Sequence, residues 1–148
     1  MLDDTQVFLP EVWASHAQFR ANKLALICGE TRLTWSELNS ECNRIANALL
    51  NAGLGKPSKI AVLMGNSATA ATVFLGVMKS GACIVPISTL LTPKQVATLI
   101  SDSGAQCLIT DAKNQPLASA ALEELSAAFT GTLVLDGAEV AGWQDLNA

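Results

Sequence analysis

The chain has 148 residues, of which 50% are hydrophobic and 15% are charged, and its formal net charge is −4 at pH 7. This length fits one compact domain with a sizeable core, and the hydrophobic content excludes an intrinsically disordered chain. The acidic balance argues against nucleic acid as a partner, because nucleic-acid-binding domains are typically basic. An ordinary soluble domain has about 25% charged residues, so the surface of this one is expected to be short of charge.

The first fifty residues predict a short helix, a hairpin and a long helix. The helix spans 12–20, and strand-like segments at 24–28 and 31–33 flank a Gly-Glu turn. Thr34 and Glu37 have the spacing of a capping box, in which each side chain bonds the backbone amide of the other residue. The helix that follows carries one apolar stripe and ends at Gly53. The stripe consists of Trp35, Leu38, Cys42, Ile45 and Leu49.

Strand-like and helical segments alternate in the rest of the chain. Ser67 is placed to cap one helix and Thr92 another, and Gly81 and Gly104 are placed to end them. The second of these helices is predicted to bury Val96, Leu99 and Ile100. The predicted strands are 59–64, 82–86, 107–109 and 132–135, and the last predicted helix is 117–129. This rhythm predicts an α/β fold with a mostly parallel β-sheet and helices on both faces.

The compartment is predicted from the cysteines and from the start of the chain. Residues 1–5 contain two acids and no basic residue, so we expect no secretory signal. The four cysteines form no metal-binding or disulfide pattern, and buried reduced thiols in a cytoplasmic protein are expected. They are Cys28, Cys42, Cys83 and Cys107. The uncharged stretch 60–78 has the length of a membrane span, but Gly65-Asn66-Ser67 breaks it, so no transmembrane segment is predicted.

The usual catalytic residues are scarce. His16 is the only histidine and lies far in sequence from any nucleophile, so a structural or solvated role is favoured over catalysis. No metal-ligand spacing, nucleophile elbow or glycine-rich phosphate loop is present, so no catalytic, cofactor-binding or metal-binding residue is predicted.

One turn remains as a candidate for substrate contact. Asn66 and Ser67 lie between a buried strand and a helix, where α/β sheets bind ligands and where helix N-termini favour anions. The alternative for Ser67 is that it only caps its helix. The Ser88-Thr89 turn after the next strand has the same two interpretations, with less support.

The motifs along the chain have a characteristic order and spacing. They are the segments 33–38, 43–46, 60–67, 74–82, 85–88, 91–93, 102–105 and 108–111. Together they resemble the N-terminal segment of the adenylate-forming (AMP-binding) superfamily. The combination with Leu91-Thr92-Pro93 is most similar to the acyl-CoA synthetases, or fatty-acid–CoA ligases. The superfamily's Ser/Thr/Gly-rich loop ending in Pro-Lys-Gly has no counterpart here, nor do its later motifs.

The resemblance implies that residues 1–148 form the N-terminal portion of an AMP-binding domain, truncated before the ATP phosphate-binding loop. The parent would join a carboxylic acid to ATP, giving an acyl-adenylate and pyrophosphate, and CoA would then release AMP and the acyl-CoA. ATP, Mg²⁺ and CoA are thus expected for the parent and no cofactor for this chain, which is expected to be inactive alone. The implied partners are the missing C-terminal remainder of the enzyme and, for the isolated chain, a second copy bound through an uncovered apolar face.

Two other interpretations remain open from the sequence. The chain could be a naturally short interaction module that kept this fold without the chemistry, or an independent α/β domain that binds a small ligand. The first is distinguished by a natural stop after Ala148, and the second requires a pocket built by this chain alone.

Overall fold

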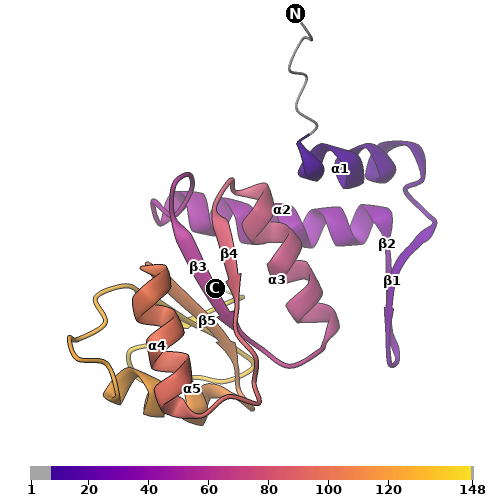
Figure 1. Ribbon diagram of the computed structural model, residues 1–148. Coiled ribbons are helices and arrows are strands. Elements are labelled where there is room, and N and C mark those ends of the chain that lie inside the picture. The colour runs from indigo at the N-terminus through magenta and orange to yellow at the C-terminus, as the bar shows by residue number, and fades with distance from the viewer. Residues whose placement is uncertain (1–7, 148) are drawn as a thin grey trace, which may run out of the picture.

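The computed structural model describes residues 8–147, and its centre is a five-stranded sheet (Figure 1). The spatial order of the strands is β4-β3-β5-β6-β7, and every neighbouring pair is parallel. The strand of this sheet that comes first in sequence, β3, therefore lies inside the sheet, and β4 forms one edge. The strands are β3 (Lys59–Leu63), β4 (Cys83–Pro86), β5 (Cys107–Asp111), β6 (Thr132–Asp136) and β7 (Gln144–Asp145).

Helices cover both faces of this sheet, which confirms the predicted α/β fold. Ile60 and Val62 of β3 pack with α2 and α3 on one face, whereas Ala61 and Leu63 pack with α4 and α5 on the other. Because both sets are buried, the strand reads as an unbroken apolar run. The helices are α2 (Trp35–Asn51), α3 (Ala68–Lys79), α4 (Pro93–Ser103) and α5 (Gln115–Glu123).

The N-terminal elements lie outside the sheet (Figure 1). Helix α1 (Leu9–Phe19) packs on α2, and β1 (Leu24–Cys28) and β2 (Thr31–Thr34) form a separate antiparallel hairpin. The helix begins three residues before the predicted start, because Pro10 occupies its first turn, where a missing amide costs nothing.

The predicted start of α2 is confirmed. Thr34 donates its amide to a carboxylate oxygen of Glu37 at 2.8 Å, and the Glu37 amide donates to the Thr34 hydroxyl oxygen at 3.3 Å. These bonds to the amide and hydroxyl of Thr34 hold the pKa of the Glu37 carboxyl below its usual value. The apolar stripe is buried at Leu38, Cys42, Ile45 and Leu49, and Trp35 is half-buried.

The structure corrects three expectations and adds one strand. Helix α5 ends at Glu123 rather than at residue 129, because Leu125 and Phe129 turn back to pack on the cluster of α4 and α5. Leu99 is 40% exposed and Ala97 is buried in its place. The two-residue strand β7 was not predicted at all. Cys83 is exposed and Cys28 half-exposed, because they lie in the edge strand β4 and in the outlying hairpin.

All four cysteines are free, as expected, and Cys42 and Cys107 are fully buried. Within residues 8–147, no helix is both long enough and apolar enough to cross a membrane.

Candidate functional site

The strand connections diverge at the carboxyl edge of the sheet, where such a divergence forms a crevice. The chain leaves β3 toward α3 on one face and leaves its two neighbours, β4 and β5, toward α4 and α5 on the other face. Ligands of open α/β sheets bind at such a point, where two adjacent connections diverge. The predicted turn at Asn66 and Ser67 follows β3 directly, so the fold places it at this edge.

The carboxylate of Asp111 ties the two diverging strand ends together. One oxygen accepts the Gly65 amide at 2.8 Å, and the other accepts the backbone amide of Asn114 at 2.8 Å and its side-chain amide at 2.7 Å. Just below, the buried Thr110 hydroxyl donates to the Leu63 carbonyl at 2.7 Å. The turn after β3 is therefore held by polar side chains of β5.

The two candidate residues of this turn differ in their surroundings. The Ser67 hydroxyl oxygen accepts the Ala70 amide at 3.0 Å and so caps α3, as expected for a helix cap. Asn66 is exposed and makes no side-chain hydrogen bond within residues 8–147. Its side chain is thus available to a ligand, whereas the hydroxyl oxygen of Ser67 is already engaged.

A hollow of about 580 Å³ opens between this turn and the loop after β4. Polar and apolar surface contribute about equally to its lining, and its polar side chains are neutral: Asn66, Ser88 and Thr89. The Ser88-Thr89 turn, a weaker prediction, therefore faces the same hollow as Asn66. The lining residues are Met64, Gly65, Asn66, Phe74, Pro86, Ile87, Ser88, Thr89 and Leu90.

These residues do not fit a nucleoside triphosphate. A site for several phosphate charges uses Lys or Arg side chains, a bound cation or a cradle of backbone amides. Among the residues that the structure describes, no lysine or arginine lines the hollow. The nearby amides of Gly65 and Ala70 are already bonded to Asp111 and Ser67. No group of three or more metal-ligating side chains occurs between residues 8 and 147.

Asp111 is the residue of this site that the sequence analysis missed. The available signal was an acid at the carboxyl end of a buried strand. His16 lies elsewhere and stacks against Trp35, with ring centroids 4.6 Å apart and planes tilted by 49°. This contact supports the structural role expected for His16.

The groups with shifted pKa values also lie away from the hollow. Burial raises the pKa of the Cys42 thiol to about 11 and that of Cys107 to about 12. Burial lowers the pKa of the Lys79 ammonium, which donates to the Asn39 side-chain oxygen. These groups belong to the packing of α2, α3 and β5 and not to the crevice.

Comparison with known proteins now defines the class. The family model described as AMP-binding enzyme matches residues 13–148. The fatty acid–[acyl-carrier-protein] ligase ScoC of Streptomyces coeruleorubidus is 32% identical over 136 residues, which are 92% of this chain and 25% of that protein. The long-chain-fatty-acid–CoA ligase FadD13 of Mycobacterium tuberculosis is 36% identical over 91 residues, or 62% of this chain and 18% of FadD13. The chain thus belongs to the family of AMP-binding, or adenylate-forming, enzymes.

A solved structure of the family superimposes on most of the chain. It is the anthranilate CoA ligase AuaEII in complex with anthranoyl-AMP, with a TM-score of 0.84 and 28% identity. The superposition covers 93% of this chain and 26% of AuaEII. The chain therefore spans about a quarter of the length of ScoC and of AuaEII.

Proposed function

We propose that this chain is the N-terminal part of an ATP-dependent acyl-CoA synthetase and that it is not catalytic by itself. The parent would convert a carboxylic acid and ATP to an acyl-adenylate and pyrophosphate, and the CoA thiol would then displace AMP. The observation that carries the proposal is the family match over residues 13–148 of a chain that covers only a quarter of ScoC.

The chemistry of the described residues supports the proposal that the chain is not catalytic by itself. Adenylation moves negative charge onto pyrophosphate, and enzymes stabilise such charge with basic groups, backbone donors and a metal ion. The hollow at the carboxyl edge offers one amide side chain, two hydroxyls and no cation. ATP, Mg²⁺ and CoA would therefore be held mainly by residues beyond this chain, and Asn66 is the side chain here that is freest to contact substrate.

CoA is proposed as the thiol, with a carrier-protein thiol as the alternative. FadD13 and AuaEII are named as CoA ligases, whereas ScoC is named as an acyl-carrier-protein ligase. A cytoplasmic location is part of the same proposal, because ATP and CoA are cytoplasmic substrates.

Isothermal titration calorimetry of the 148-residue chain with ATP and Mg²⁺ tests the proposal. We expect no saturable heat, and no acid-dependent product when hydroxylamine is added to trap an acyl-adenylate. Saturable binding of ATP at micromolar concentration, or turnover in the trapping assay, would show that this chain has a nucleotide site of its own and would overturn the proposal.

A further inference from the structure

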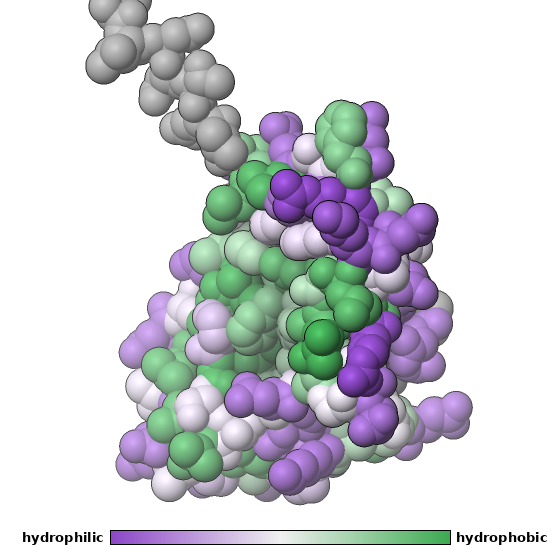
Figure 2. Space-filling model, turned by 90° about the vertical axis from the view of Figure 1, so that its right-hand side faces the viewer, coloured by the Kyte–Doolittle hydropathy of each residue, from purple (hydrophilic) through white to green (hydrophobic). Residues whose placement is uncertain are grey.

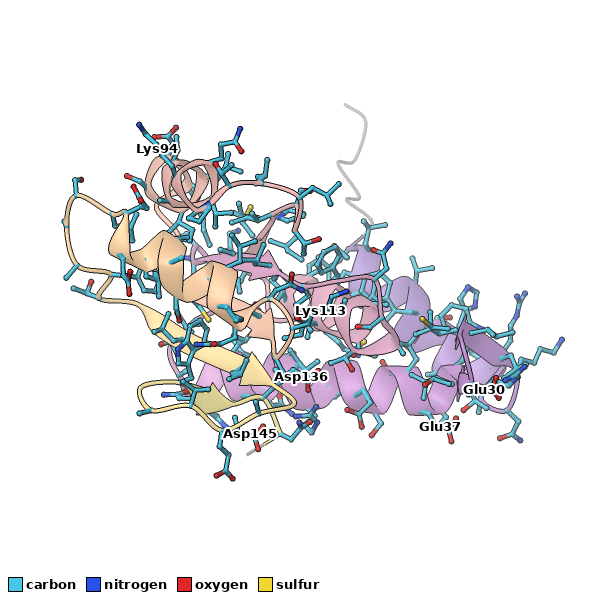
Figure 3. All side chains as sticks on the ribbon, turned by 90° about the horizontal axis from the view of Figure 1, so that it is seen from below. Glu30, Glu37, Lys94, Lys113, Asp136 and Asp145 are labelled. Atoms are coloured by element: carbon cyan, nitrogen blue, oxygen red, sulfur yellow. The ribbon has the colours of Figure 1, made fainter. Side chains whose placement is uncertain are left out.

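A second cavity lies on the sheet face that α2 covers, away from the carboxyl edge. Its volume is about 610 Å³, within the roughly 300–1,000 Å³ that is typical of small-molecule sites. The C-terminal half of α2 forms one wall, and β5, β6 and β7 form the other. Figure 3 shows this arrangement from below, with Asp136 and Asp145 labelled on the strands that face α2.

The floor of the cavity is apolar, and its rim, at Asn51 and Gln144, is exposed to solvent. Side chains from α2 and the sheet line it and are at most 8% exposed: Ile45, Leu49, Leu54, Ile109 and Leu146. A guest with an apolar part removes this apolar surface from water when it binds. A guest that binds the folded chain and not the unfolded chain therefore stabilises the fold.

The β7 segment closes one end of the cavity. The Arg44 guanidinium of α2 donates to the Leu146 carbonyl at 2.7 Å and to the Asn147 side chain at 3.3 Å. The Leu146 amide donates to the Leu135 carbonyl at 3.0 Å. These bonds hold the Leu146 side chain in the cavity wall, so the closure depends on a few polar contacts.

Three of the four polar side chains on the lining are neutral. The side chains of Asn51, Thr132 and Gln144 make no hydrogen bond to any other described residue. Within residues 8–147, Asp145 is the one charged lining residue, and no lysine or arginine lines the cavity. A carboxylate guest would lose its hydration and gain no cation, and it would lie near the Asp145 charge. An uncharged guest avoids both costs and can bond the free amides and hydroxyl.

We propose that this cavity is a binding site for a small uncharged amphiphile, with an apolar chain and one hydrogen-bonding head group. The proposal goes beyond the proposed ligase function, because the guest is not a carboxylic acid and the site is not at the carboxyl edge. It also gives the chain a pocket built from its own residues.

Binding of 1-octanol and of octanoate to the 148-residue chain at pH 7 tests the proposal. We expect saturable binding of 1-octanol with a raised melting temperature, and binding of octanoate at least tenfold weaker. Chemical shifts of the Ile109 and Val134 amides should change on titration with 1-octanol. Absence of saturable 1-octanol binding to the folded chain would overturn the proposal, as would equal affinity for octanoate.

Two variants locate the site. Ala48 lies on α2 at the cavity, and Ala48→Phe should block it and abolish the melting shift. Ser40 is exposed on the same helix outside the lining, and Ser40→Phe should keep the shift. If Ala48→Phe does not fold, Thr132→Val removes the hydroxyl with little change of shape and should weaken 1-octanol binding several-fold. Equal binding by a folded cavity variant and by Ser40→Phe would assign the binding to the general surface and overturn the proposal. None of these outcomes depends on whether the chain binds ATP.

Discussion

Asp111 decides the geometry of the candidate crevice, although it does not line the hollow. Its carboxylate accepts three amide hydrogens from Gly65 and Asn114, and Asn114 is only 8% exposed. Asp111→Ala leaves the Gly65 amide and the Asn114 side-chain amide without this partner, whereas the Asn114 backbone amide keeps its bond to the Asp111 carbonyl at 3.1 Å. The loss of partners costs about 1–3 kcal/mol for a buried group. Asn66 makes no such bond, so Asn66→Ala should change stability by no more than about 0.5 kcal/mol.

Urea unfolding of the two variants measures this difference. Asp111→Asn is the matched control, because it keeps the shape and one acceptor oxygen and should lie between wild type and Asp111→Ala. An Asn66→Ala loss as large as that of Asp111→Ala would mean that the Asn66 side chain holds the turn itself, and the crevice would lose its free polar group.

The buried thiols predict the behaviour of the protein at alkaline pH. Their folded pKa values of about 11 for Cys42 and about 12 for Cys107 lie above the unfolded thiol value of about 8.5. A raised folded pKa means that the unfolded state loses its proton first. The stabilising contribution of these thiols is therefore complete below about pH 8.5 and is lost as pH rises through 11 to 12. The chain has no tyrosine, which removes one other titrating group from this range.

Chemical denaturation as a function of pH tests the thiol effect. Stability of Cys107→Val should fall less steeply above about pH 8.5 than that of wild type, since one titrating thiol is gone. Cys83 is exposed, so Cys83→Ser should follow the wild-type slope. Burial lowers the pKa of Lys79, so Lys79 changes the stability with pH in the opposite sense. Because Lys79 is present in all three proteins, it does not affect the comparison of their slopes. Equal slopes for wild type and Cys107→Val would contradict the prediction.

At the scale of elements, helix ends show where glycine is required. Gly81 follows α3 with φ of +82°, and a side-chain carbon built there would meet nothing closer than 3.8 Å. Only the backbone conformation therefore opposes substitution, and Gly81→Val should cost about 1–3 kcal/mol. Gly81→Asn should cost clearly less, because asparagine tolerates the left-handed region. Thermal unfolding of Gly81→Val and Gly81→Asn measures this difference in stability. Equal losses of stability in the two variants would mean that backbone strain is not the cause. Gly53 has φ of +74°, so the same two substitutions there are expected to show the same difference in stability.

Elements with local signals were predictable, and those that depend on distant contacts were not. The capping boxes at Thr34 and Thr92 involve residues three apart, so the sequence alone located both helix starts. The early end of α5 depends on Leu125 packing across the molecule. The Asp111 bond to Gly65 depends on β5 lying beside β3, and the strand order was not predicted. The carboxyl-edge crevice was therefore anticipated at Asn66 and missed at Asp111.

At the scale of the whole molecule, the shortage of charge goes with exposed apolar side chains at the N-terminal end. In α1 and β1 they include Leu9 (59% exposed), Phe19 (76%), Leu24 (54%) and Ile27 (58%). Figure 2, which looks onto the side that carries the hairpin and α3, shows hydrophobic residues gathered around a hollow. Monomeric proteins rarely expose contiguous apolar patches beyond a few hundred Å². We therefore expect the isolated chain to self-associate through this side.

The edge strand β4 is a poor alternative route to self-association. The backbone amides of Cys83 and Ile87 donate to carbonyls in and just before β3. Because the backbone groups of a strand point alternately to its two sides, those of Ile84 and Pro86 face the free edge. Pro86 has no amide hydrogen and the Ala82 amide donates to the Ser80 hydroxyl oxygen, which leaves Ile84 as the free donor of that strand. A second copy has little to pair with there, so contact through side chains is favoured over an added strand.

Light scattering at increasing concentration, together with binding of a dye for hydrophobic surfaces, tests this prediction. The double variant Phe19→Asp and Ile27→Lys should lower both signals, because it places charges of both signs on the apolar side without touching the core. Leu99→Lys is the matched control, since Leu99 is exposed on α4, far from the N-terminal elements in the fold, and it should leave both signals unchanged. A wild-type chain that stays monomeric at high concentration and binds no dye would show that its exposed side chains do not form one adhesive surface. The low charge would then need another cause.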